Sequence, residues 1–120
     1  MTKYLAFLAC ILVSACQYLP ITSLTSTTTI GGNNAFVLGN NPHGSFSASL
    51  TNLSNTEVKV WRCPLAGGQH SPVLVKPKEQ IRVRVEKNTA LRIENSSAQA
   101  VDVLLKVKGD TGLSMGYLKP

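Results

Sequence analysis

Charge is missing from almost half of this chain, because no Asp, Glu, Lys or Arg lies between Lys3 and Glu57. From Glu57 onward basic side chains outnumber acidic ones, and the formal net charge of the whole chain is +6. An excess of positive charge favours contact with anionic surfaces. Lipid head groups, acidic glycans and acidic proteins are therefore the classes of partner that the composition favours.

Cysteine is also scarce, with three residues in 120. Cys10 lies in the N-terminal apolar segment and Cys16 directly follows that segment, so Cys63 is alone in the rest of the chain. A single thiol cannot form an intramolecular disulfide, and the folded part must be stable through packing. We expect Cys63 to be a small buried residue beside Trp61; the alternative is a reactive thiol or an intermolecular disulfide.

No continuous apolar run is long enough to span a bilayer as a helix. Lys3 is followed by 12 uncharged and mostly apolar residues, 4–15. As a helix they would reach about 18 Å, against a hydrocarbon core of roughly 30 Å. A basic residue, a short apolar run and small residues at its end are the parts of a secretory signal peptide. We therefore predict that residues 1–15 are a signal peptide.

The end of this segment, Val13-Ser14-Ala15-Cys16, resembles the lipobox of bacterial lipoproteins. The resemblance implies that the chain is cut before Cys16 and that acyl chains such as palmitate are attached through this cysteine. The next residue is Gln17 rather than Asp, which resembles the pattern of lipoproteins sent to the outer membrane. We expect a lipid-anchored protein of the bacterial cell envelope, located in the outer membrane and facing either the periplasm or the cell surface, with no nucleic acid as partner.

The segment after the cysteine is polar and rich in Ser and Thr up to Gly31-Gly32. Stretches of this composition commonly act as flexible tethers. We therefore predict that residues 16–33 form a lipid-anchored tether and that residues 34–120 form one domain. The alternative is a first β-strand, because Thr and Ile favour strands and Leu24 and Ile30 offer apolar anchors.

Helical periodicity is lacking after Gly32, and the alternation typical of strands takes its place. The clearest case is Ile81, Val83 and Val85, which alternate with charged residues. Similar alternating or short apolar runs occupy residues 35–38, 45–51, 57–63, 73–75, 90–93, 101–108 and 113–117. Seven or eight short strands separated by turn residues predict an all-β fold, a small immunoglobulin-like β-sandwich. A small β-barrel is the alternative.

Clusters of catalytic or metal-binding residues are missing as well. Cys63 and His70 lie on either side of one Gly-rich loop, but no third group at a recognisable spacing would orient such a pair. Asp102 and Asp110 stand apart, and no paired Cys or His spacing marks a metal site. We expect no enzyme activity, no catalytic residues, no metal and no cofactor.

Basic side chains on strands are the strongest candidate for a binding surface. Arg82 and Arg84 lie on the same face of one strand, about 7 Å apart. If the strands that carry Arg92 and Lys106 are its neighbours, the four side chains form a cationic patch.

The sequence thus favours a non-catalytic lipoprotein, structural or accessory to an envelope protein assembly. The alternative is a module that binds an anionic glycan, a lipid head group or an acidic partner; an ordinary solvated face would carry the same charges.

Overall fold

The computed structural model describes residues 23–118, and all regular structure in this range is β. The strands are β1 (Ser23–Ile30), β2 (Asn34–Leu38), β3 (Phe46–Asn52), β4 (Val58–Pro64), β5 (Val73–Val75), β6 (Gln80–Val85), β7 (Thr89–Asn95), β8 (Val101–Gly109) and β9 (Met115–Leu118). Within residues 23–118 there is no helix long and apolar enough to cross a membrane. The predicted signal peptide, Cys16 and the start of the predicted tether lie outside the described residues.

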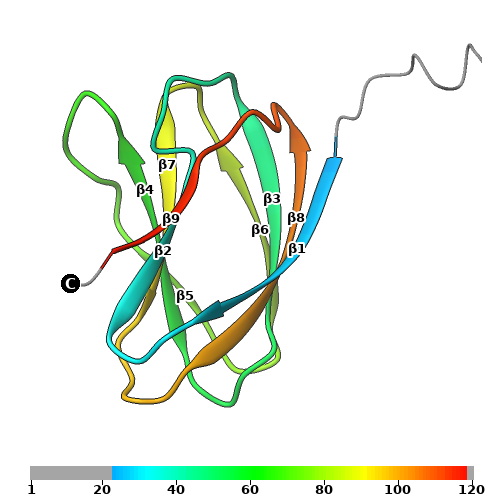
Figure 1. Cartoon of the computed structure of the whole chain (residues 1–120), viewed down its shortest axis with the longest axis vertical. Helices are drawn as coiled ribbons and strands as arrows, with labels where there is room; N and C mark the ends of the chain where they lie inside the picture. Colours follow the sequence, from blue (N-terminus) through cyan, green and yellow to red (C-terminus); the bar gives the residue numbers. More distant parts are fainter. Residues whose placement is uncertain (1–22, 119–120) are drawn as a thin grey trace, which may run out of the picture.

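The strands form two open sheets that pack face to face (Figure 1). Sheet A has the order β1-β8-β3-β6, and sheet B has the order β5-β4-β7-β2-β9. Each sheet keeps two free edges, so the described residues form a sandwich rather than the closed alternative. The β-sandwich predicted from the sequence is therefore confirmed.

The strands pair as a nested set, in which β1 lies beside β8, β2 beside β7, β3 beside β6 and β4 beside β5. All four pairs are antiparallel. One long hairpin wrapped onto two sheets produces this pairing, which is the connectivity of a jelly roll. β9 then extends sheet B beside β2. The architecture is that of the predicted sandwich, but the strand order differs from the ABED and CFG sheets of immunoglobulin domains.

The Ser- and Thr-rich segment at the start of the described range forms a strand and not a tether. Ser23–Ile30 pairs with β8 along its whole length. Thr28 and Ile30 are buried, whereas Thr27 and Thr29 between and beside them are exposed. β-Branched threonines fit the pleated surface of a sheet, and pairing with β8 supplies backbone hydrogen bonds. The polar composition of the segment does not show that such a partner strand exists. The tether prediction is wrong for these residues, and the β domain begins before residue 34.

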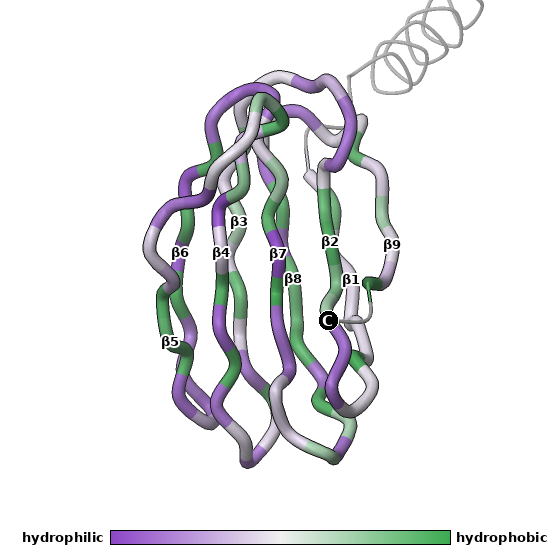
Figure 2. Tube along the Cα trace, turned by 90° about the vertical axis from the view of Figure 1, so that its left-hand side faces the viewer, coloured by the Kyte–Doolittle hydropathy of each residue, from purple (hydrophilic) through white to green (hydrophobic). Residues whose placement is uncertain are grey.

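The hydrophobic core lies between the sheets and follows the predicted alternation where it is strict. In β6, Val83 and Val85 are buried, while Arg82 and Arg84 are exposed. Ile81 is partly buried and packs against the core. Figure 2 shows this alternation as successive green and purple segments along β6. The inward side chains of β8 are all buried as predicted, namely Val101, Val103, Leu105 and Val107.

Candidate binding surface on sheet A

The outer face of sheet A has small side chains on its inner strand β3 and long cations on both neighbouring strands. Ser49 pairs with Arg82 of β6 on one side and with Lys106 of β8 on the other. The next row repeats this order with Arg84, Ser47 and Lys108. Residues that pair directly point to the same face of a sheet, so the two rows share one surface. We call these six residues the basic trough.

The dimensions of the basic trough follow from strand geometry. Neighbouring strands lie about 4.8 Å apart, so the two columns of cations stand about 10 Å apart across β3, and successive rows are about 7 Å apart. An open hollow of about 380 Å³ lies between them, with Gln80 completing its lining. The Gln80 Nε2 donates a hydrogen bond of 2.7 Å to Ser49 Oγ, which leaves the hydroxyl hydrogen of Ser49 free to donate outward.

The charge of the basic trough is not neutralised by the protein itself. Within residues 23–118 the one ion pair joins Arg92 to Glu94, at 3.1 Å. The carboxylate of Asp102, which lies elsewhere on β8, accepts a hydrogen bond of 2.6 Å from Thr29. Four exposed cations without a carboxylate partner therefore face solvent together, a charge arrangement that favours a multiply charged anion.

The structure divides the cationic patch that the sequence predicted. Arg82, Arg84 and Lys106 lie together, whereas Arg92 belongs to β7 in sheet B, where it pairs with Glu94. The prediction that Arg92 belongs to the patch is therefore wrong, because its strand lies in the other sheet. Lys108 was missed, although its spacing from Lys106 places both on one face of β8. The alternating serines of β3 were the signal for the floor of the trough.

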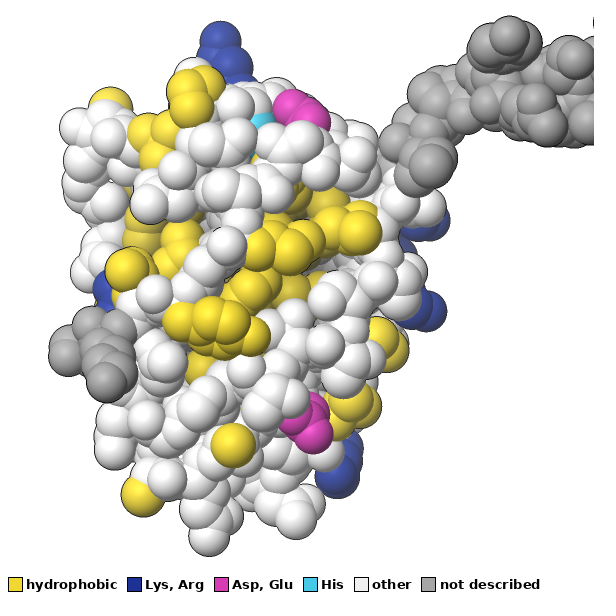
Figure 3. All heavy atoms as spheres, viewed as in Figure 1, with side chains coloured by type: hydrophobic (Ala, Val, Ile, Leu, Met, Phe, Trp, Pro, Cys, Tyr) yellow, Lys and Arg dark blue, Asp and Glu magenta, His cyan; other side chains and the backbone are white. Residues whose placement is uncertain are grey.

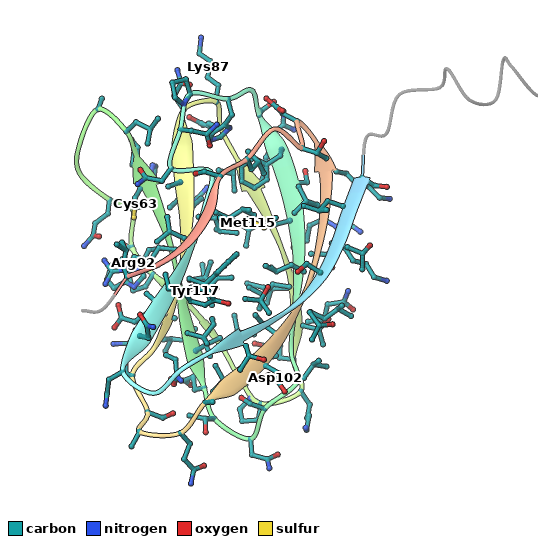
Figure 4. The ribbon with its side chains drawn as sticks, viewed as in Figure 1. Cys63, Lys87, Arg92, Asp102, Met115 and Tyr117 are labelled. Atoms are coloured by element: carbon teal, nitrogen blue, oxygen red, sulfur yellow. The ribbon has the colours of Figure 1, made fainter. Side chains whose placement is uncertain are left out.

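Cys63 lies on the outer side of sheet B and not in the core. Figure 4 shows it near Arg92, and its side chain is half-buried rather than buried as expected. Burial raises the pKa of the Cys63 thiol, and the nearby positive charge of Arg92 lowers it in part. A raised thiol pKa reduces the fraction of reactive thiolate at neutral pH.

The thiol–imidazole pair considered from the sequence is not formed. The Cys63 thiol donates a long hydrogen bond, of 4.0 Å, to Gln69 Oε1. His70 instead donates its backbone N–H to the carbonyl oxygen of Arg62, at 3.0 Å. In the described part of the chain, no group of three or more His, Cys, Asp or Glu residues is arranged to hold a metal ion.

A second exposed surface is apolar and lies along strand β9. All four residues of β9 are exposed, with Met115 at 49% and Tyr117 at 55%. Figure 3 shows a band of hydrophobic side chains across the open side of the sandwich, between β9 and β1. The ring of Tyr117 meets that of Phe36 edge-on, with 5.5 Å between the centroids. This apolar edge is separate from the basic trough, which occupies the outer face of sheet A.

Comparison with known protein families and with curated protein sequences finds no match to this chain. The geometry of the basic trough and the motif that ends at Cys16 therefore carry the functional conclusion.

Proposed function

We propose that this protein is a non-catalytic, lipid-anchored lipoprotein of the bacterial cell envelope whose β-sandwich binds an anionic ligand through the basic trough. The anchor is proposed from the lipobox-like residues that end at Cys16. The binding role is supported by one observation above all: two columns of exposed cations without a carboxylate partner flank the serines of β3.

The chemistry of the basic trough suits phosphate, carboxylate or sulfate groups. Arg82 and Arg84 present planar guanidinium forks that bind two oxygens of such groups at once. Lys106 and Lys108 add point charges, and the serine hydroxyls donate further hydrogen bonds. Each exposed cation by itself binds an anionic group only weakly, because solvent and salt screen the interaction. A ligand with several anionic groups, such as an acidic glycan or a lipid surface, therefore fits better than a single small ion.

The apolar edge along β9 supports a second role, as an accessory that holds an envelope protein. An exposed strand edge offers unpaired backbone groups to a strand of another protein, and neighbouring apolar side chains add affinity. Met115, Tyr117 and Leu118 supply such side chains at this edge. This role would use a surface other than the basic trough.

Binding to immobilised lipopolysaccharide, a phosphorylated glycolipid, tests the anionic-ligand role. Arg82→Ala with Lys106→Ala removes one complete row and should weaken binding of the full chain by roughly tenfold. Lys59→Ala with Lys76→Ala removes the same charge from exposed positions outside the trough and should have little effect. Equal losses in the two double variants, or no loss in either, would overturn the proposal.

A further inference from the structure

We infer that the anionic ligand of the basic trough is the set of phosphate head groups in the same membrane leaflet that holds the lipid anchor. This inference rests on the proposed function, because it needs both the anchor at Cys16 and the trough. It assigns the trough a position against the membrane, rather than facing a polymer farther away.

The first support is the short connection between the proposed anchor and the sandwich. Strand β1 begins at Ser23, so only residues 17–22 separate it from Cys16. A fully extended chain advances at most about 3.6 Å per residue, which keeps Ser23 within about 25 Å of Cys16. A tether over residues 16–33 would have allowed more than twice this reach. Strand β1, which occupies 8 of the 18 residues of the predicted tether, thus holds the sandwich close to the lipid.

The second support is the place where this connection joins sheet A. Ser23 pairs with Lys108, and Lys108 pairs in turn with Ser47 of the basic trough. The row continues to Arg84 on β6. In Figure 1, β1 starts at the end of sheet A where β8 finishes. Because Ser23 is one strand away from Lys108, the short connection carries this row of the trough to the membrane surface.

The third support is electrostatic. Each Lys or Arg close to an anionic leaflet strengthens attachment roughly fivefold, and the effect fades over about 10 Å at moderate salt. The anchor keeps the trough near the head groups at a high effective concentration, so individually weak contacts are sufficient. A lipid chain combined with a basic patch is a common way to obtain stable membrane attachment.

The lining of the basic trough favours phosphate groups over sugar rings. The hollow of about 380 Å³ is lined by Ser, Gln, Arg and Lys residues alone, and Phe46, beside Arg84 and Lys108, is buried at 3% exposure. Aromatic side chains supply the large apolar contact area on which a sugar ring can pack. A surface with cations and hydroxyls alone recognises charged oxygens, which lipid phosphates present at high density.

Lysine footprinting on the full, lipidated protein tests this inference. The protein is reconstituted into phosphatidylcholine vesicles with and without phosphatidylglycerol, treated with an amine-reactive reagent and analysed by mass spectrometry. Phosphatidylglycerol should slow the labelling of Lys106 and Lys108 about fivefold, and high salt should restore it. Lys59 and Lys76, exposed outside the trough, should label equally fast on both kinds of vesicle.

Matched variants distinguish protection that requires the basic trough from protection that follows from net positive charge alone. Arg82→Ala with Arg84→Ala should abolish the protection of Lys106 and Lys108, whereas Lys59→Gln with Lys76→Gln should preserve it. Full-speed labelling of Lys106 and Lys108 in protein that floats with phosphatidylglycerol vesicles would overturn the inference and leave the anchor intact. Protection by added lipopolysaccharide polysaccharide, but not by vesicles, would also overturn it and leave the anionic-ligand role standing. Flotation of Cys16→Ala with pure phosphatidylcholine vesicles, as complete as that of the wild type, would instead contradict the anchor in the proposed function.

Discussion

Asn52 and Asn95 occupy matching positions in the two sheets, since each ends a strand, is fully buried and holds the turn that follows. The Oδ1 of each accepts hydrogen bonds from the backbone N–H and the hydroxyl of the serine two residues later, Ser54 or Ser97. The side-chain amide nitrogen of Asn52 donates to the backbone carbonyl oxygens of Thr56 and Val75. That of Asn95 donates to the backbone carbonyl oxygens of Ile30, Gly31 and Gln99. The two Asn-x-Ser triplets are therefore structural turns.

Asn95→Ala should lower the free energy of unfolding by about 2–4 kcal/mol, because it leaves one buried and several partly buried backbone groups without this partner. Denaturant unfolding followed by the fluorescence of Trp61 measures this loss. The control is Asn55→Ala. Asn55 is exposed in the turn that follows Asn52, and its replacement should change stability by less than about 0.5 kcal/mol. A cost for Asn95→Ala no larger than that of this control would contradict the role of its hydrogen bonds.

The two faces of β6 should respond in opposite ways to truncation. Val83→Ala removes two methyl groups from a buried position and should cost about 1–3 kcal/mol of stability. Arg82→Ala with Arg84→Ala, on the exposed face, should change stability by no more than about 0.5 kcal/mol per site. Thermal or denaturant unfolding measures the stability of each variant. A double arginine variant that fails to fold would be incompatible with the observed register.

Asp110 should make the stability of the protein depend on pH in the acid range. The backbone N–H of Gly44 donates to its carboxylate at 2.6 Å and that of Gly112 at 2.8 Å, and these bonds hold the pKa of Asp110 below its usual value. A lowered pKa in the folded state gives stability that is present above the ordinary Asp pKa, near 4, and is lost as pH falls through the lower, folded value.

The stability difference between the wild type and Asp110→Ala should therefore be full at neutral pH and shrink as pH falls below about 4. Denaturant unfolding of both proteins across this range measures it, with Asp102→Ala as a comparison. A difference that grows on acidification would reverse the expected sign.

Cys16→Ala should abolish the incorporation of a labelled fatty acid into the protein. The expectation follows from the lipobox-like motif and the short apolar segment before it. Metabolic labelling followed by immunoprecipitation measures incorporation, and Cys63→Ala serves as the matched loss of a thiol that should keep the label. Equal labelling of the wild type and Cys16→Ala would refute lipid attachment at this residue.

The strands with strict alternation could be predicted from the sequence because each carries its own signal. In β6, apolar residues alternate with Gln80, Arg82 and Arg84, and in β8 Leu104 is the one interruption of the same alternation over residues 101–108. This pattern alone fixes which side chains face the core. Strand β1 carries no such contrast, since its inward positions include Ser26 and Thr28. Its strand structure depends on pairing with β8, at the other end of the domain, and local composition does not report that partner.

The candidate site was predictable only within a single strand. The shared face of Arg82 and Arg84 follows from spacing, and the addition of Lys106 required the neighbours of β6 to be known. Arg92 was grouped with them because strand spacing does not reveal which layer a strand joins. In the nested pairing, β7 joins sheet B, and its arginine pairs with Glu94 on the opposite side of the molecule.

The nested pairing also sets the order in which the domain can form during synthesis. β4 and β5 are near neighbours in the chain, whereas β1 must wait for β8, which is made almost last. At about 5–20 residues per second, the first strand of the described domain spends several seconds without β8, the strand with which it pairs. A chain truncated before β8 would leave β1 unpaired and expose the edge of β3. Loss of residues 101–120, the last sixth of the sequence, should therefore yield an aggregating product rather than a smaller stable domain.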